Sequence, residues 1–181
     1  SGMLDIRGKL VPEICGDYYI ASSKDESPNM GAFRLVKASD SGVGDDIVLT
    51  QVDINSLTSS KAAMYSILQV MIELNAGISF SDLSKFYVAG TFGSFIDPAS
   101  AISIGMLPDI PMDRFEVLGN SSLEGASRLL VDPDAFEEIN AIRDSITYIE
   151  LNVNQEFMNI FSGAKFYPHT DRSRFPSFRT Q

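Results

Sequence analysis

The stretch FYVAGTFGSFIDPASAISIGMLPD, residues 86–109, contains the pattern that decides the fold. Phe86–Ala89 is a continuous apolar run followed by glycine, which is typical of a strand buried on both faces of a sheet. Asp97 and Pro98 predict a helix start, because the carboxylate can cap the helix and proline suits its first position. This helix is expected to end near Gly105–Leu107. The stretch therefore predicts a strand, a glycine turn and a helix in succession.

The clearest helix of the chain precedes this stretch. Five apolar residues recur at helical spacing and predict one core-facing stripe: Met64, Ile67, Leu68, Met71 and Ile72. The helix is expected over about residues 59–75, with Thr58 or Ser59 as its cap and Gly77 just beyond its end.

Short strands and helices continue on both sides of these elements. Upstream, Ile47–Thr50 is expected to be a short strand. The elements predicted downstream are a strand at Phe115–Leu118, a helix from Asn120 to about Val131, a helix from Asp132-Pro133 to about Ser145, a strand at Thr147–Leu151 and a short helix at Glu156–Ser162. Strand and helix alternate from residue 47 to 151, which predicts the α/β class with a mainly parallel sheet flanked by helices.

The chain is expected to divide into three segments. Residues 1–46 form an irregular N-terminal segment of the same lobe, with short strands at Tyr18–Ala21 and Phe33–Val36. Residues 47–168 form the α/β lobe itself. Residues 169–181 form a polar tail with three arginines, which is either disordered or docked elsewhere.

The composition excludes several classes of protein. The 181 residues are 44% hydrophobic, enough for a core, and carry a net charge of −10. An acidic surface argues against binding to nucleic acid or to an anionic membrane, and no apolar run approaches the ~18 residues of a membrane span. One cysteine, Cys15, and one histidine, His169, exclude a disulfide framework, a Cys-rich zinc site and a cysteine-ligated iron–sulfur cluster. We expect a soluble, cytoplasmic protein without a metal site of its own.

Two glycine turns are the candidate ligand-binding positions. Gly90–Ser94 follows one predicted strand and Gly119–Ser122 follows another. Ligands of open α/β sheets bind beyond the carboxyl ends of the strands, where glycine lets a ligand approach the backbone. Two interpretations stay open, because the glycines can also serve only to turn tight corners between strand and helix.

The same residues resemble a known family. The run from Val88 to Asp109, with its AGTFGS, DP and IGMLPD elements, is similar to the C-terminal domain of the reductive activators of corrinoid proteins. Three further segments fit this family: residues 115–122 (FEVLGNSS), Lys61–Ala63 and Tyr148–Leu151. The resemblance covers about residues 47–168. Gly2–Gly8 also resembles a segment from within that domain, so the chain is expected to be a fragment that begins mid-domain.

The resemblance implies a fold and a site. The fold is that of the actin, sugar-kinase and heat-shock-chaperone ATPases, in which a ribonuclease-H-like lobe holds nucleotide in a cleft against a second lobe. The Gly90–Ser94 turn then resembles the adenosine motif and Gly119–Ser122 the second connecting segment. The implied nucleotide-binding residues are Gly90, Thr91, Gly93, Ser94, Gly119 and Asn120. The implied cofactor of the complete protein is ATP with Mg²⁺.

The resemblance also implies a reaction and a partner. Full-length members carry an N-terminal two-iron two-sulfur domain that passes an electron to the cob(II) form of a partner corrinoid protein, and ATP helps to drive the reduction to cob(I). The present chain has no cluster-binding cysteines and no phosphate-binding motif of the first lobe. It is therefore interpreted as mainly the second lobe, with unknown catalytic residues and no expected activity of its own.

Several individual side chains have both a structural and a functional interpretation. Lys61, at the expected start of the long helix, is a candidate for reaching a phosphate or else a solvated surface lysine. Asp97 is interpreted as a helix cap, not as a metal ligand. Asn120 either contacts nucleotide or stabilises its turn, and Phe92 either stacks on a base or fills the core.

Three functions follow as hypotheses. The first is the nucleotide-binding lobe of an ATP-dependent reductive activator of corrinoid proteins. The second is an interaction module of the same fold, used for homodimerisation or for docking the corrinoid protein without binding nucleotide. The third is one lobe of a small-molecule kinase, against which the FGS, DP, IG and LPD elements argue.

Overall fold

The computed structural model describes residues 2–22, 30–90, 93–151 and 155–178. In chain order it begins with a short helix, α1 (Pro12–Cys15), and three short strands, β1 (Tyr19–Ile20), β2 (Ala32–Val36) and β3 (Ile47–Thr50). These strands form an antiparallel sheet in the order β1-β2-β3. The N-terminal segment thus contains the strands that the sequence predicts.

Helix α2 (Gln51–Gln69) is the long helix at the centre of the fold. It begins directly after β3, because Thr50 and Asp53 form a reciprocal capping box: each side chain accepts a hydrogen bond from the other's backbone N–H. The helix continues as a π-helical turn at Val70–Asn75. The predicted start at residue 59 is therefore wrong, and Thr58 and Ser59 lie inside the helix rather than at its cap.

The buried face of α2 differs from the predicted apolar stripe. Met64 and Met71 are 44% and 49% exposed, so the expectation that both face the core is wrong. The residues that α2 buries are a mixed polar and apolar set: Gln51, Ile54, Thr58, Lys61, Ala62, Tyr65, Ser66 and Gln69. Polar side chains on this face make bonds to distant segments, which a hydrophobic pattern does not register.

A parallel pair of strands follows α2. β4 (Phe86–Ala89) pairs with β5 (Phe115–Gly119), and the register places Ala89 opposite Gly119. The α/β class with a parallel sheet is confirmed, with two strands in parallel among the described residues. Tyr87 is 57% exposed, however, so the prediction that β4 is buried on both faces is wrong.

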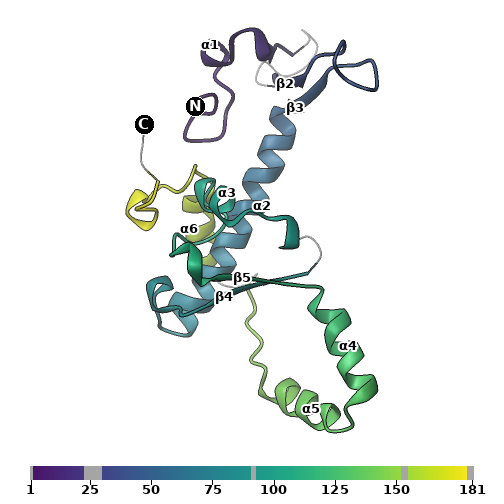
Figure 1. Ribbon diagram of the computed structural model, residues 1–181. Coiled ribbons are helices and arrows are strands. Elements are labelled where there is room, and N and C mark those ends of the chain that lie inside the picture. The colour runs from purple at the N-terminus through teal and green to yellow at the C-terminus, as the bar shows by residue number, and fades with distance from the viewer. Residues whose placement is uncertain (1, 23–29, 91–92, 152–154, 179–181) are drawn as a thin grey trace.

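The helices after β4 begin at polar caps. α3 (Pro98–Ser103) starts at Asp97, whose carboxylate accepts from Ser100 N, as predicted. α4 (Ser121–Val131) also lies where the sequence places it. α5 (Ala135–Ser145) begins after Asp134, later than the predicted Asp132-Pro133 start. α4 and α5 extend away from the rest of the fold beyond β5 (Figure 1).

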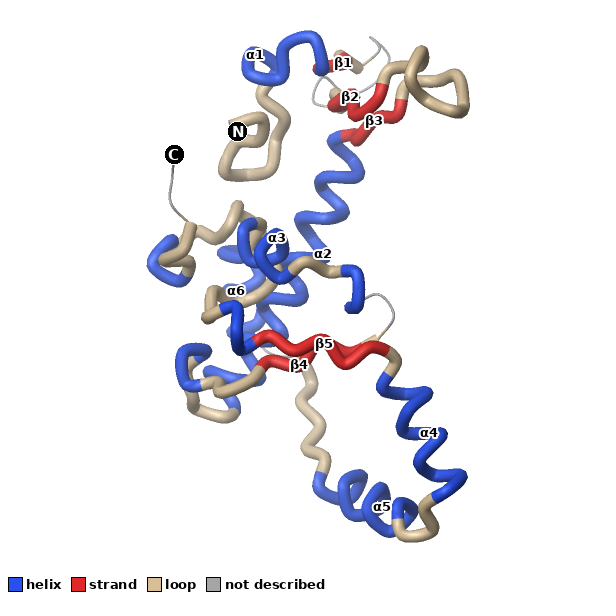
Figure 2. Tube along the Cα trace, viewed as in Figure 1, coloured by secondary structure: helices blue, strands red, loops and turns tan. Residues whose placement is uncertain are grey.

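The last part of the chain returns to α2. The predicted strand at Thr147–Leu151 is absent, because these described residues pair with no strand and Tyr148 is 85% exposed. α6 (Gln155–Ala164) lies alongside α2 (Figure 2). The segment after α6 docks on the core, since Pro168, His169 and Phe175 are buried.

The core lies between α2, α3, α6 and the chain around them. Its buried members are Ala62, Tyr65, Phe80, Ala101, Ile102, Leu107, Ile110, Ala164 and Phe175. The Tyr65 ring lies 5.4 Å from that of Phe175 and 5.9 Å from that of Phe80, measured between ring centroids. The tail after residue 168 therefore contributes to the core through Phe175.

Candidate functional site

Gly90 and Gly119, the first residues of the two glycine turns, lie side by side at the carboxyl ends of β4 and β5. Gly90 N donates a hydrogen bond of 2.6 Å to Gly119 O, directly beyond the Ala89–Gly119 pair of the strand register. Because parallel strands place their carboxyl ends at one edge, these two glycines lie together at that edge of the sheet.

The backbone conformation at this edge requires glycine and leaves room for a ligand. Gly90 and Gly119 have φ values of 97° and 67°, in the left-handed region that side chains disfavour. A Cβ built on either residue would meet no atom within 4 Å. Gly90 and Gly119 are half-buried, and the open space in front of them leaves room for a flat or polar ligand group.

Gly93 has a different role from these two glycines. It is buried, and a Cβ there would lie 2.8 Å from Val88 Cγ1. Close packing between the turn and β4 therefore explains this glycine without a ligand. Thr91 and Phe92 lie outside the described residues, and so does the side chain of Ser94.

Asn120 caps the helix that follows its turn. Its Oδ1 accepts a hydrogen bond of 3.1 Å from Leu123 N at the start of α4. The turn-stabilising interpretation is thus confirmed for the oxygen. The backbone of Asn120 still lies next to Gly119, so the residue borders the open edge.

The carboxylate of Asp97 caps helix α3. The carboxylate accepts from Ser100 N at 3.0 Å and from Ser100 Oγ at 2.6 Å. These bonds, first that from the hydroxyl, lower the pKa of Asp97 below its usual value. The side chain is a helix cap, as the sequence indicates.

Lys61 is not at a helix start. It lies in the middle of α2 and is fully buried. Its Nζ donates to Phe166 O and, at 2.8 Å, to Pro168 O, and lies 4.7 Å from the centre of the Tyr167 ring. Burial lowers its pKa from 10.5 to about 7. The interpretation of Lys61 as a solvated surface lysine is therefore wrong, and its amine is directed at backbone carbonyls of residues 166–168.

His169 is a second buried polar residue that the sequence placed in a polar tail. Its ring lies 5.3 Å from that of Tyr65, and its Nδ1 accepts from Asp171 N. Burial, followed by the nearby charge of Arg174, lowers the pKa of His169. The sequence signal for both residues is weak, because the carbonyls that bond Lys61 and the Tyr65 ring beside His169 are about a hundred positions away along the chain.

The residues of this chain do not fit an iron–sulfur cluster. Cys15 is its one cysteine, is buried, and donates to Met3 O at 3.6 Å. Among the described residues, no group of three or more His, Cys, Asp or Glu side chains is placed to hold a metal ion. Within the same part of the chain, each helix is too short or too polar to span a bilayer.

We call the sheet edge at Gly90 and Gly119 the glycine edge. This edge and the fold define an α/β lobe of the actin, sugar-kinase and heat-shock-chaperone ATPase (ASKHA) type, and comparison with known proteins agrees. The family model described as the C-terminal domain of RACo, the ASKHA domain, matches residues 1–179. The chain therefore belongs to this family, as its AGTFGS and IGMLPD elements indicate.

Relatives and a solved structure support the assignment. The chain is 35% identical over 164 residues to the corrinoid activation enzyme RamQ of Eubacterium limosum, covering 89% of this chain and 27% of the relative. It is 23% identical over 121 residues to the [Co(II) methylated amine-specific corrinoid protein] reductase of Methanosarcina barkeri, covering 66% of this chain and 22% of the relative. A solved structure of a reductive activator for corrinoid,iron-sulfur protein matches with a TM-score of 0.85 and 35% identity, over 98% of this chain and 27% of that one.

The chain thus spans about a quarter of the length of the relatives that it matches. The part that matches is one lobe with one glycine edge.

Proposed function

We propose that this chain is the nucleotide-binding lobe of an ATP-dependent reductive activator, which returns a corrinoid protein from the cob(II) to the cob(I) state. The names of its relatives, a corrinoid activation enzyme and a Co(II) corrinoid protein reductase, support a role in corrinoid activation. Its family membership supports the ASKHA fold for the lobe. Neither name describes a small-molecule kinase.

One observation carries the nucleotide assignment: the hydrogen bond that joins Gly90 to Gly119 at an edge with open space in front of both residues. We assign the adenosine side of the cleft to the backbone of Gly90, Gly119 and Asn120. Thr91 and Ser94 would complete it with their hydroxyl groups, and Gly93 would hold the turn against β4. Lys61 is excluded, because its amine is buried against the carbonyls of the segment after α6.

In the proposed protein, this lobe binds the nucleotide and another domain supplies the electron. ATP bound with Mg²⁺ would supply the free energy that an uphill one-electron reduction of cobalt requires. A two-iron two-sulfur cluster would supply the electron from another domain, since this chain has no ligands for one. The residues at the glycine edge bind and orient the adenosine and carry out no bond-breaking step themselves.

An amide NMR titration tests the nucleotide site. Adenosine and Mg·ATP are added separately to the ¹⁵N-labelled chain, and shifts are expected at Gly90, Gly119 and Asn120 even if binding is only millimolar, about −4 kcal/mol. Gly119→Ala should remove them, because the positive φ at this residue strains any side chain. Gly44→Ala is the matched control: its φ is 76° and a Cβ would also meet no atom within 4 Å, but it lies in the loop after β2. Unmoved amides at the edge of a folded chain would contradict the assignment.

A second candidate function, a docking module, is favoured by the surface of α4 and α5. None of residues 121–131, all of which the structure describes, is buried, and Leu130 is 88% exposed. Further large apolar side chains are exposed on this pair of helices and just after it: Leu123, Val131, Phe136, Ile139, Ile142, Ile146 and Tyr148. Such a surface suits a protein partner, either the corrinoid protein or a second copy of the chain. Sedimentation with and without the corrinoid protein separates the candidates, because docking without nucleotide dependence would favour the module.

A further inference from the structure

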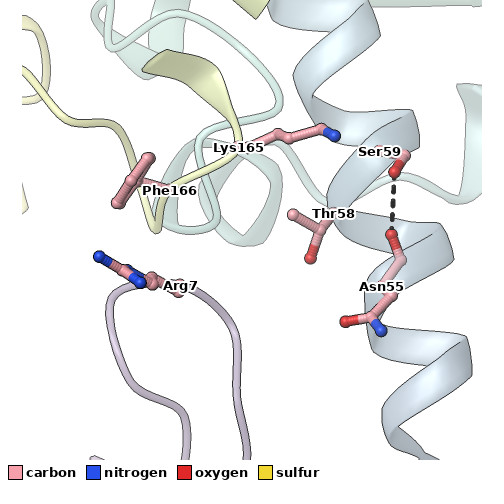
Figure 3. A pocket seen from close by; sticks show the side chains of 6 residues that line it. All are labelled: Arg7, Asn55, Thr58, Ser59, Lys165 and Phe166. Carbon is pink, nitrogen blue, oxygen red and sulfur yellow. Dashed lines mark hydrogen bonds between the residues drawn. The ribbon is translucent and has the colours of Figure 1, made fainter. Parts of the chain in front are cut away.

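A pocket of about 380 Å³ lies on the side of α2 where the chain's beginning and its last segment meet. Three of its lining residues, Asn55, Thr58 and Ser59, share one face of α2 (Figure 3). The other three come from two further segments: Arg7, Lys165 and Phe166. None of the six belongs to the glycine turns, so this pocket is separate from the proposed adenosine site.

The frame of the pocket is fixed by buried contacts. Gly8, next to Arg7, has a φ of 76°, and a Cβ there would lie 2.6 Å from Tyr167 Cε2. Gln51 Nε2 donates to Gly8 O at 2.8 Å, and Tyr167 N donates to Ile6 O at 3.0 Å. The two segments that carry the cationic side chains are therefore held at constant separation before any ligand arrives.

Both cations of the pocket lack a carboxylate partner. Among the described residues, neither Arg7 nor Lys165 forms an ion pair, and no acidic residue is among the six that line the pocket. The Lys165 ammonium lies 4.9 Å from the centre of the Phe161 ring. Elsewhere among the described residues, Arg34, Lys85, Arg128, Arg143 and Arg174 do pair with carboxylates. Arg7 and Lys165 thus line one pocket without an ion-pair partner in the described chain, whose full sequence carries a net charge of −10.

Polar groups of α2 line the same pocket. Asn55 Oδ1 accepts from Gln51 Nε2 at 3.1 Å, so the amide is oriented by its neighbour while its Nδ2 donates no hydrogen bond within the described chain. Ser59 Oγ donates its one proton to Asn55 O at 3.1 Å (Figure 3), which leaves the Asn55 Nδ2 as the donor that this face of α2 offers to an anion.

We propose that this pocket binds a small, multiply charged oxyanion between Arg7 and Lys165. The guanidinium fork suits two oxygens of one phosphate or carboxylate group, and the ammonium suits a second anionic group on the same ligand. The Asn55 amide contacts the oxygen between them. The volume exceeds that of a single phosphate and lies in the range of small-ligand sites. Phosphate and carboxylate ligands share this chemistry, so the probes must distinguish them.

Pyrophosphate and citrate are the two probes. Each is titrated into the ¹⁵N-labelled chain, and amide shifts are expected at Asn55, Ser59 and Phe166, with weaker binding at higher ionic strength. Arg7→Gln and Lys165→Gln should each weaken binding about tenfold. Both side chains are exposed, so the variants leave the core intact.

Two control variants remove cations elsewhere. Lys9→Gln and Arg172→Gln change exposed residues outside the pocket, and each should leave the affinity within about twofold of wild type. Tighter binding of pyrophosphate than citrate identifies a phosphate-bearing ligand, and the reverse order a carboxylate-bearing one. Absence of shifts at the pocket, or an equal loss in pocket and control variants, overturns the proposal. These results do not depend on the glycine turns. The adenosine site is tested separately, by the titration with adenosine and Mg·ATP.

Discussion

Replacing Lys61 by methionine tests how a buried amine fastens the last segment of the chain to α2. Nζ donates to Phe166 O and Pro168 O and lies over the Tyr167 ring, with no carboxylate at hydrogen-bonding distance among the described residues. Methionine keeps most of the volume and removes the charge. The comparison of wild type and variant at several pH values then isolates the protonation of this one group.

The sign follows from the two pKa values of Lys61. Burial lowers its pKa from 10.5 in an exposed chain to about 7 in the fold. Between these values the unfolded chain binds a proton that the folded chain does not, so the free energy of unfolding rises with pH across this window. One pKa unit corresponds to about 1.4 kcal/mol, which gives an upper bound of roughly 5 kcal/mol over the whole window. The two carbonyl oxygens and the Tyr167 ring favour the ammonium form, and they reduce this gain.

Urea unfolding between about pH 7 and about pH 9 measures the effect. The stability of wild type minus that of Lys61→Met should grow by roughly 2 kcal/mol over these two pH units, and below about pH 7 it should be constant. Lys9→Met, which removes an exposed lysine, is the control for the loss of one positive charge. A constant difference for Lys61→Met as well would refute the reasoning, because the carbonyls and the ring would then hold the amine protonated throughout.

Two further variants test the packing of the same segment. Gly105→Ala should lower the free energy of unfolding by about 3 kcal/mol, because φ is 75° and the new Cβ would lie 1.9 Å from Pro168 O. Gly44→Ala is the control, since it has the same backbone strain but open space around the new Cβ, and it should lose only about 1 kcal/mol. Thermal unfolding measures both variants. His169→Gln should make stability less sensitive to acid: burial lowers the pKa of His169, so wild type loses stability as pH falls below about 6.5, and equal acid sensitivity of both proteins would contradict this account.

The elements that the sequence predicted correctly are those with local causes. Asp97 caps α3 through Ser100, three residues away, and Asn120 caps α4 through Leu123 in the same way. Glycines at strand ends likewise reveal their role within their own turn. These signals require no knowledge of the rest of the fold, so a sequence pattern finds them.

The start of α2 was missed although its signal is also local. Thr50 and Asp53 have the spacing of a capping box, and the apolar stripe further along the helix drew the predicted start away from them. The predicted strand at Thr147–Leu151 failed for the opposite reason. Its apolar and β-branched residues favour a strand, but a strand needs a neighbour, and these described residues have none.

Long-range polar contacts explain why the stripe of α2 was misjudged. Three polar residues on the buried face of α2 fasten two other parts of the chain. Gln51 bonds the N-terminal turn at Gly8, whereas Thr58 and Lys61 both bond the segment at residues 166–168. Hydrophobic periodicity counts these positions as solvent-facing, so it rotated the predicted core face toward the two methionines. The same contacts position the backbone that presents the two unpaired cations of the oxyanion pocket. The polar face of α2 therefore organises both the docking of the chain's ends and the pocket between them, and a loss of the Lys61 bonds should disturb the pocket before it disturbs the glycine edge.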